Sequence, residues 1–114
     1  MSKIIKGVNY AVRNGATVLN LSLGGNIESR AFRQALANAY HSAVIVAAAG
    51  NSHYNLDDPF KFELPSYPAA WSFVLGVQAT QQDGELAGFS NYDPSGPNSS
   101  PAVNKDALNV EALL

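Results

Sequence analysis

The chain has 114 residues, of which 46% are hydrophobic and 14% are charged, and this composition indicates one globular domain with a hydrophobic core. The formal net charge is -2 and no Lys/Arg cluster occurs, so we expect no nucleic-acid partner. Cysteine is absent, which excludes disulfide bonds and cysteine nucleophiles. No apolar segment is long enough to predict a membrane span.

The N-terminal segment predicts a helix followed by a strand. Apolar residues between Ile4 and Val12 recur at helical spacing, and Asn14-Gly15 is a typical helix stop. Residues 17–23 (TVLNLSL) then alternate, with leucines on one face, which predicts a strand that ends at Gly24-Gly25.

A second helix is expected over residues 29–41, with Phe32, Leu36 and Tyr40 on the side that packs into the core. It is followed by AVIVAAAGN, residues 43–51, an apolar run that is unbroken until a glycine and an asparagine. A run without polar alternation is typical of a strand covered on both faces, as in parallel sheets.

These elements predict an α/β fold of three layers, with helices on both faces of a mostly parallel sheet. A strand, a helix and a second strand with short links form a βαβ unit. The strands that end at Gly24 and Gly50 should therefore be parallel, with their carboxyl ends on one rim. In open parallel sheets the ligand crevice lies beyond such ends.

The second half of the chain is less regular. The connection over residues 52–71 shows no clear period and is expected to line the rim. Residues 73–79 predict a third strand, Asp83-Gly84 a hairpin turn, and residues 86–92 the returning strand. Pro, Ser, Gly and Asn dominate residues 93–104, which predicts a loop or tail.

Several kinds of site are disfavoured by the residues themselves. Neither GxGxxG nor GxxxxGK[ST] occurs, which argues against a nucleotide or other small-molecule phosphate site at the rim. Taken alone, Asn51 is a turn residue, because asparagine after glycine tolerates left-handed geometry. Metal-ligand spacing is also lacking, so the following side chains are interpreted as solvated surface: His41, His53, Asp57, Asp58 and Glu63.

Four sequence blocks considered together change this interpretation. GATVLNLSLGG, AVIVAAAGN, YPAAWSFVLGVQA and LAGFSN follow one another between Gly15 and Asn91. In this order they resemble the middle of a subtilisin-like serine peptidase, and the resemblance implies a partial subtilisin-like fold. It implies that residues 1–92 are the central part of a peptidase domain. Residues 93–114 would be a poorly matched loop or tail of the same domain.

The resemblance implies a catalytic role for Asn51. In that family the asparagine after the Ala-Ala-Gly turn donates its side-chain N–H to the oxyanion that forms on the scissile carbonyl during acyl transfer. Gly50 would let the main chain approach the substrate closely.

The same resemblance implies a cleft for an extended peptide or protein substrate, which would pair with a strand edge of the enzyme. The strand edge would be formed by Ser22, Leu23, Gly24 and Gly25, and it would be one wall of the pocket for the substrate residue before the cut. The opposite wall would be formed by Ala48, Ala49 and Gly50. Ser66 would lie near the floor of the pocket. The backbone oxygens of Ala69, Trp71 and Val74 match a weak cation site of some members. Calcium or another cation is thus an optional ligand of the parent protein, and no cofactor is required.

The catalytic triad of such an enzyme is missing from the sequence. The family's triad runs in the order Asp, His, Ser, but no Asp-Thr-Gly or Asp-Ser-Gly, no His-Gly-Thr-His and no Gly-Thr-Ser-Met-Ala occurs. We therefore expect a segment of a serine endopeptidase that is inactive alone and needs the flanking segments of its parent. The alternative is a non-catalytic α/β module, or a degenerate peptidase relative, that binds extended peptides without cutting them.

Two further expectations concern the surroundings of the chain. If the family sheet is only partly present, residues 17–23 become an exposed edge strand, which predicts self-association. Family habit implies a secreted or extracytoplasmic protein, whereas no residue of this chain indicates its compartment.

Overall fold

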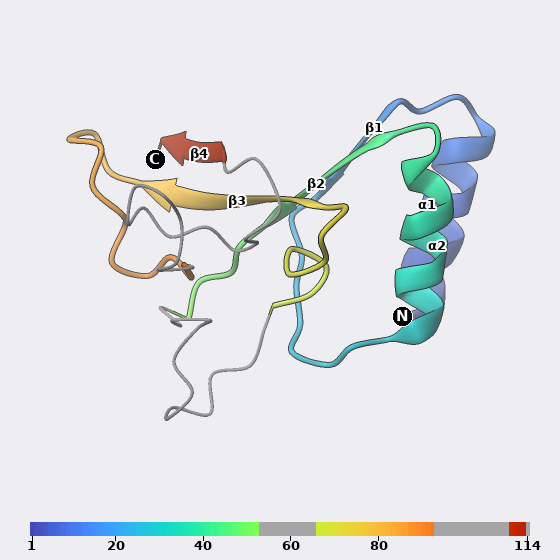
Figure 1. The fold of residues 1–114 in the computed structure, drawn as a ribbon, viewed down its shortest axis with the longest axis horizontal. Coiled ribbons are helices and arrows are strands. Elements are labelled where there is room, and N and C mark those ends of the chain that lie inside the picture. Colours follow the sequence, from blue (N-terminus) through green and yellow to red (C-terminus); the bar gives the residue numbers. More distant parts are fainter. Residues whose placement is uncertain (53–65, 93–109, 114) are drawn as a thin grey trace.

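A computed structural model describes residues 1–52, 66–92 and 110–113 (Figure 1). Four strands form one parallel sheet in the order β1-β2-β3-β4, which confirms the predicted α/β class. The elements along the chain are α1 (Ser2–Arg13), β1 (Val18–Leu21), α2 (Arg30–Tyr40), β2 (Val44–Ala48), β3 (Leu75–Thr80) and β4 (Val110–Leu113).

The two helices begin and end close to their predicted boundaries. After α1, the side-chain amide of Asn14 donates to the carbonyl of Tyr10 at 2.8 Å, and Gly15 follows with a φ of 85°. Before α2, the hydroxyl of Ser29 accepts a hydrogen bond from the N–H of Phe32 at 3.3 Å. Such caps satisfy main-chain groups that a helix leaves without an internal partner.

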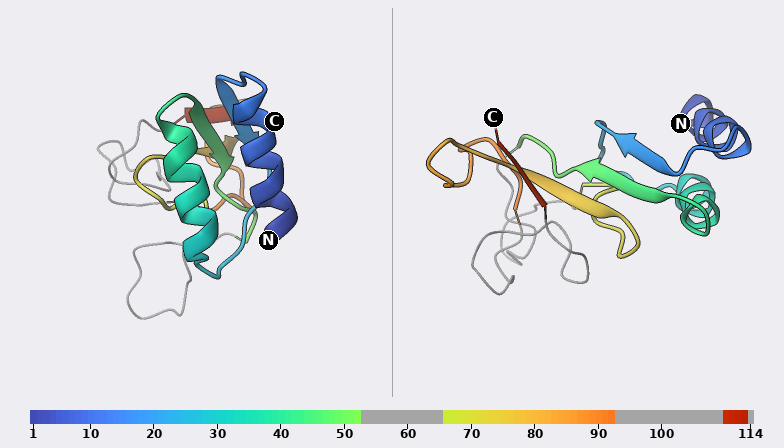
Figure 2. Two further views of the ribbon diagram at one scale, coloured as in Figure 1. Left: turned by 90° about the vertical axis from the view of Figure 1, so that its right-hand side faces the viewer. Right: turned by 90° about the horizontal axis from the view of Figure 1, so that it is seen from above.

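Both helices pack against the same face of the sheet (Figure 2). Leu19 of β1 and Ile45 of β2 are neighbours in the parallel register and are both buried. They share one hydrophobic cluster with Val8 of α1 and Leu36 of α2. The core therefore lies between β1, β2 and a single helical layer.

The opposite face of β1 and β2 is open in the described part of the chain. Val18 and Val44 are 60% and 56% exposed, and Ala48 is exposed as well. Burial alternates along β2 because only one face of the strand, that of Ile45 and Ala47, packs in the core with α1 and α2. Of the two helical layers expected, the described residues form one.

Two finer predictions were wrong. Tyr40, expected in the core, is the last residue of α2 and is 56% exposed, although its ring lies 5.9 Å from that of Phe73. The hairpin turn is present, with Gly84 at a φ of 85°, but residues 86–92 form isolated bridges rather than a strand, among them the bridge between Thr80 and Leu86. Beyond this bridge the chain turns back towards the end of β2, where the main-chain N–H of Asn91 donates to Gly50.

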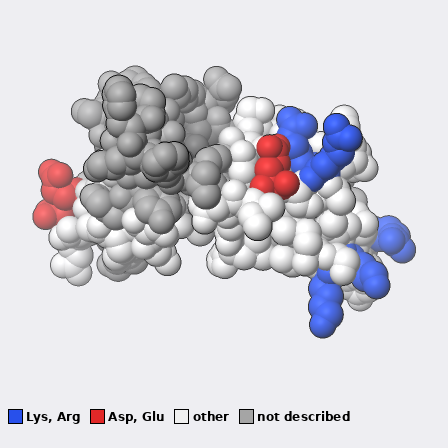
Figure 3. Space-filling view, turned by 90° about the horizontal axis from the view of Figure 1, so that it is seen from below, with Lys and Arg blue, Asp and Glu red and all other residues white. Residues whose placement is uncertain are grey.

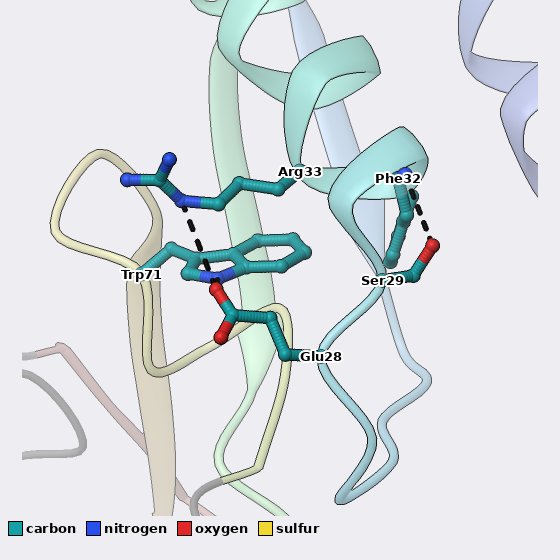
Figure 4. A network of polar contacts seen from close by, with 5 residues as sticks. All are labelled: Glu28, Ser29, Phe32, Arg33 and Trp71. Atoms are coloured by element: carbon teal, nitrogen blue, oxygen red, sulfur yellow. Dashed lines mark hydrogen bonds and ion pairs between the residues drawn. The ribbon is translucent and has the colours of Figure 1, made fainter.

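Residues 66–74, which precede β3, are anchored on the loop before α2 (Figure 4). The indole N–H of Trp71 donates to a carboxylate oxygen of Glu28 at 3.3 Å, and Nε of Arg33 lies 4.0 Å from the same oxygen. The Trp71 ring also stacks on Phe73 and meets Phe32 edge-on, with centroids 6.0 and 5.6 Å apart. This cluster fixes the position of Ser66 and Tyr67 beside the carboxyl end of β1.

Candidate active site

A cavity of about 280 Å³ opens beyond the carboxyl ends of β1 and β2. Its walls come from the segment after β1, the turn after β2 and the first described residue of the segment before β3. The residues that line it are Ser22, Leu23, Gly24, Gly25, Asn26, Ala48, Gly50, Asn51, Ser52, Ser66 and Asn91. The structure thus brings together every predicted cleft residue except Ala49, which lines an adjoining cavity.

The turn that carries Asn51 leaves the sheet abruptly. The last ladder contact of β2 is the hydrogen bond from the N–H of Ala49 to Val77 at 2.8 Å. Gly50 follows with a φ of 107°, a left-handed value that disfavours other residues. The Asn51 side chain is exposed and lines both cavities, so its amide can donate to a group bound at the rim.

Ser66 lies between the two walls of the cleft. Its side chain is 5% exposed. The hydroxyl oxygen would be 2.8 Å from a Cβ added at Gly24 and 3.3 Å from one added at Gly50. A side chain at Gly24 would therefore collide with Ser66, and the space beside Ser66 depends on glycine at both positions.

Gly25 was predicted to pair with the substrate together with residues 22–24, but both of its main-chain polar groups are already hydrogen-bonded within the chain. Its N–H donates to the carbonyl of Tyr67 at 3.0 Å, and its carbonyl accepts from the N–H of Tyr67 at 2.8 Å. Residues 22–24 follow β1 without joining a strand. The main chain that an extended peptide could pair with is consequently shorter than predicted, and ends at Gly24.

The site is electrostatically neutral in the described residues. Among the described residues that line the two cavities, none has a charged side chain. Every Lys and Arg in this part of the chain belongs to α1 or α2, and on the face shown in Figure 3 the basic side chains gather at the helical end. Burial, and secondarily the carboxylate of Glu28, raises the pKa of Tyr67, so this neighbour of the cleft is a neutral phenol. Stabilisation of negative charge here would rest on hydrogen-bond donors.

The adjoining cavity, of about 300 Å³, lies along the open face of the sheet. Val46 and Ala48 of β2 and Val77 of β3 contribute to its lining, together with Asn51 at the rim. Its apolar walls belong to the face of the sheet that no described helix covers.

The predicted cation site stays a prediction. Ala69, Trp71 and Val74 are all buried, and the carbonyl of Trp71 accepts a hydrogen bond from the N–H of Val74 at 3.0 Å. Among the residues that the structure describes, no group of three His, Cys, Asp or Glu residues could hold a metal ion. In the same residues no helix is long and apolar enough to cross a bilayer. His53, Asp57, Asp58 and Glu63 lie outside the described residues.

Three residues that line the cleft were not predicted from the sequence, Asn26, Ser52 and Asn91, and of these Asn91 is the one that is buried. It is 2% exposed and its side chain binds the turn on both sides of Asn51. The block LAGFSN served only as a mark of resemblance. A polar Ser-Asn pair after a glycine-containing apolar stretch was the signal that could have indicated a buried polar role.

Comparison with known proteins gives a consistent result. The Subtilase family profile matches residues 1–106. The chain is 40% identical to subtilisin DY of Bacillus licheniformis over 91 residues, which are 79% of this chain and 32% of that protein. It is 36% identical to thermitase of Thermoactinomyces vulgaris over 90 residues, 78% of this chain and 29% of that protein. The chain thus spans about a third of the length of these relatives.

Relatives with contrasting locations occur as well, both from Bacillus subtilis strain 168. The minor extracellular protease Epr is 30% identical over 104 residues, 91% of this chain and 15% of that protein. The major intracellular serine protease is 35% identical over 88 residues, 77% of this chain and 27% of that protein.

The fold agrees with the sequence comparison. The crystal structure of the psychrophilic subtilisin-like protease Apa1 from Pseudoalteromonas sp. AS-11 superposes with a TM-score of 0.66 at 31% identity. The match covers 78% of this chain and 19% of that one. The chain belongs to the subtilase family of serine peptidases.

Proposed function

We propose that this chain forms the oxyanion-stabilising and substrate-binding part of a serine endopeptidase. The observation that carries the proposal is the shared cavity beyond β1 and β2, in which Asn51 faces the same space as residues 22–24 and Ser66. These residues are distant from Asn51 in the sequence. An asparagine with only a structural role in its turn would not need to share a cavity with them. Membership of the family supports acyl transfer as the reaction.

The chemistry follows from the groups that surround the cavity. An extended peptide pairs with the main chain of residues 22–24, and the side chain before the scissile bond enters the space beside Ser66. Attack by a serine nucleophile turns the scissile carbonyl into an oxyanion, which accepts a hydrogen bond from the Asn51 amide. A donor placed where negative charge develops stabilises the transition state more than the bound substrate.

The nucleophile and its base belong, on this proposal, to other parts of the parent protein. The triad motifs are absent from these 114 residues, and the chain spans only 32% of subtilisin DY. We expect the isolated chain to hydrolyse no peptide bond. Turnover by the purified chain, abolished by Ser22→Ala, would show that it carries a nucleophile of its own.

The role of Asn51 is tested by Asn51→Ala in the intact protein. Losing an oxyanion donor should lower kcat by roughly 10²–10³, a magnitude taken from subtilisin itself, while KM changes little. The matched control is Asn38→Ala, which removes an exposed asparagine of α2 far from both cavities. We expect wild-type kcat from this control.

An unchanged kcat in the Asn51→Ala protein would contradict the proposal. Intact protein that binds peptides at this rim without cleaving them would instead indicate the alternative function, a peptide-binding module. Isothermal titration with an extended peptide separates the two results, because binding then persists in the absence of turnover.

Cofactor, partner and compartment follow from the same proposal. The reaction needs no cofactor, and a cation at Ala69, Trp71 and Val74 would act on stability alone. The partners are the peptide substrate and the flanking segments of the parent. The relatives include both an extracellular and an intracellular protease, so we propose export by family habit and test it by fractionating the source cells.

A further inference from the structure

Asn91 encloses the turn that carries Asn51. The side-chain amide of Asn91 donates to the carbonyl of Ala49 at 3.0 Å, and its side-chain oxygen accepts from the N–H of Ser52 at 2.9 Å. Its own main-chain N–H donates to the carbonyl of Gly50 at 2.9 Å. Asn91 therefore binds the residues immediately before and after Asn51, although it is far away in the sequence.

We propose that Asn91 is a positioning residue that holds the Asn51 turn in the geometry required for oxyanion binding. This inference rests on the proposed function of Asn51. β2 can no longer fix the turn, because its last ladder bond is made by Ala49. A donor in an oxyanion hole is effective only when it is held in place before the reaction, so the turn needs another support.

The packing of Gly50 against Asn91 supports the same role. A Cβ added at Gly50 would overlap Nδ2 of Asn91, so the amide lies directly against the α-carbon of the turn. Asn91 is 2% exposed. A buried amide with both of its ends engaged keeps a single orientation, because turning it over would bring donor to donor and acceptor to acceptor.

Although Asn91 is one of the residues that line the cleft, it is only 2% exposed. Its side-chain hydrogen bonds run to the main chain of Ala49 and Ser52. We therefore expect it to influence kcat through Asn51 rather than through contact with the peptide.

The test is a double-mutant cycle in the intact protein, with Asn91→Ala, Asn51→Ala and both substitutions together. Asn91→Ala should lower kcat by about tenfold or more with little change in KM, since a small misplacement of a catalytic group is costly. In the Asn51→Ala background the same substitution should change kcat by less than about twofold, because the donor it positions is gone.

A second substitution separates positioning from folding. Asn91→Asp keeps an oxygen for the N–H of Ser52 but replaces the donor to the Ala49 carbonyl with a carboxylate oxygen, which repels that carbonyl. We expect it to fold, as shown by a wild-type circular dichroism spectrum, and to reproduce the loss of kcat. Its control is Asn14→Asp, which removes an amide that also donates to a main-chain carbonyl, that of Tyr10, at the end of α1. The control should retain wild-type kcat.

The outcomes distinguish this inference from the proposal beneath it. One result would contradict the inference alone: Asn51→Ala lowers kcat, but the Asn91 substitutions lower kcat by the same factor in the wild-type and in the Asn51→Ala background. Asn91 would then act on overall structure and not through Asn51. If Asn51→Ala leaves kcat unchanged, the proposed function itself fails.

Discussion

Ser66 and Gly24 meet across the floor of the cleft with no room for another atom between them. Only 2.8 Å would separate the Ser66 hydroxyl oxygen from a Cβ at Gly24, shorter than folded proteins allow. The same hydroxyl lies near Gly50 on the opposite wall. The shape of this part of the cleft is thus set by small residues at two separate turns.

Gly24→Ala should destabilise the protein by about 1–3 kcal/mol, the usual cost of overpacking, because the new methyl group would collide with the buried Ser66. Combining it with Ser66→Ala should recover most of the loss, because the remaining neighbour, the Tyr67 carbonyl, would be 3.5 Å away. Urea unfolding of the single and double variants measures both effects.

The control for this cycle is Gly88→Ala. A Cβ at Gly88 would meet no atom of the described residues within 4 Å, so the unfolding free energy of this variant should stay close to that of the wild type. If Gly24→Ala lowers the unfolding free energy equally in the wild type and in the Ser66→Ala variant, a collision with the Ser66 hydroxyl is not the cause of the loss.

The helices could be predicted from sequence because their signals are local. Spacing of apolar residues, the Asn14-Gly15 stop and the Ser29 cap all act within a few residues of each helix end. The extent of the strands depends on distant partners, so β1 ends at Leu21, where the chain turns to meet Tyr67. β4 was not predicted at all, since Val110–Leu113 becomes a strand only by pairing with β3.

The coverage of β2 could not be predicted for a similar reason. An unbroken apolar run indicates that both faces can be buried, but the segment that buries each face is chosen by the whole fold. Among the site residues, Asn51 and the glycines were found through the resemblance of neighbouring motifs. Asn91 was missed because its hydrogen bonds join segments that are remote in the sequence.

The cap of α2 gives a prediction at the scale of an element. Ser29→Ala removes the hydroxyl that accepts from the N–H of Phe32 and should lower the unfolding free energy by about 1 kcal/mol. Thermal unfolding followed by circular dichroism measures the change. Ser42→Ala, just beyond the same helix, is the matched control: its hydroxyl donates a long hydrogen bond of 3.4 Å to the Ala39 carbonyl, so stability should change by less than about 0.5 kcal/mol. Equal effects at both positions would show that the cap contributes nothing specific.

At the scale of the molecule, the described residues leave β1 at one edge of the sheet. Its Val18 is 60% exposed, on the face that neither α1 nor α2 covers. An uncovered edge strand presents free main-chain groups to another copy of the chain. We propose that the isolated chain self-associates through this edge.

Val18→Lys should shift the isolated chain towards the monomer, because a charged side chain on an edge strand opposes pairing with a second copy. Multi-angle light scattering across a concentration series measures the change. Tyr10→Lys introduces the same charge at an exposed position of α1 and should leave the association unchanged. A wild-type chain that stays monomeric at high concentration would contradict the prediction.

The central claim is that this chain supplies the cleft and oxyanion donor of a serine peptidase whose nucleophile lies elsewhere in the parent protein. The most direct test is labelling of the intact protein with a fluorophosphonate, which forms a covalent bond with an activated serine, followed by mass spectrometry of the labelled peptide. The account predicts one labelled serine outside these 114 residues and no labelling of the isolated chain. A label on Ser22 or any other serine of this chain, or an intact protein that takes up no label, would contradict it.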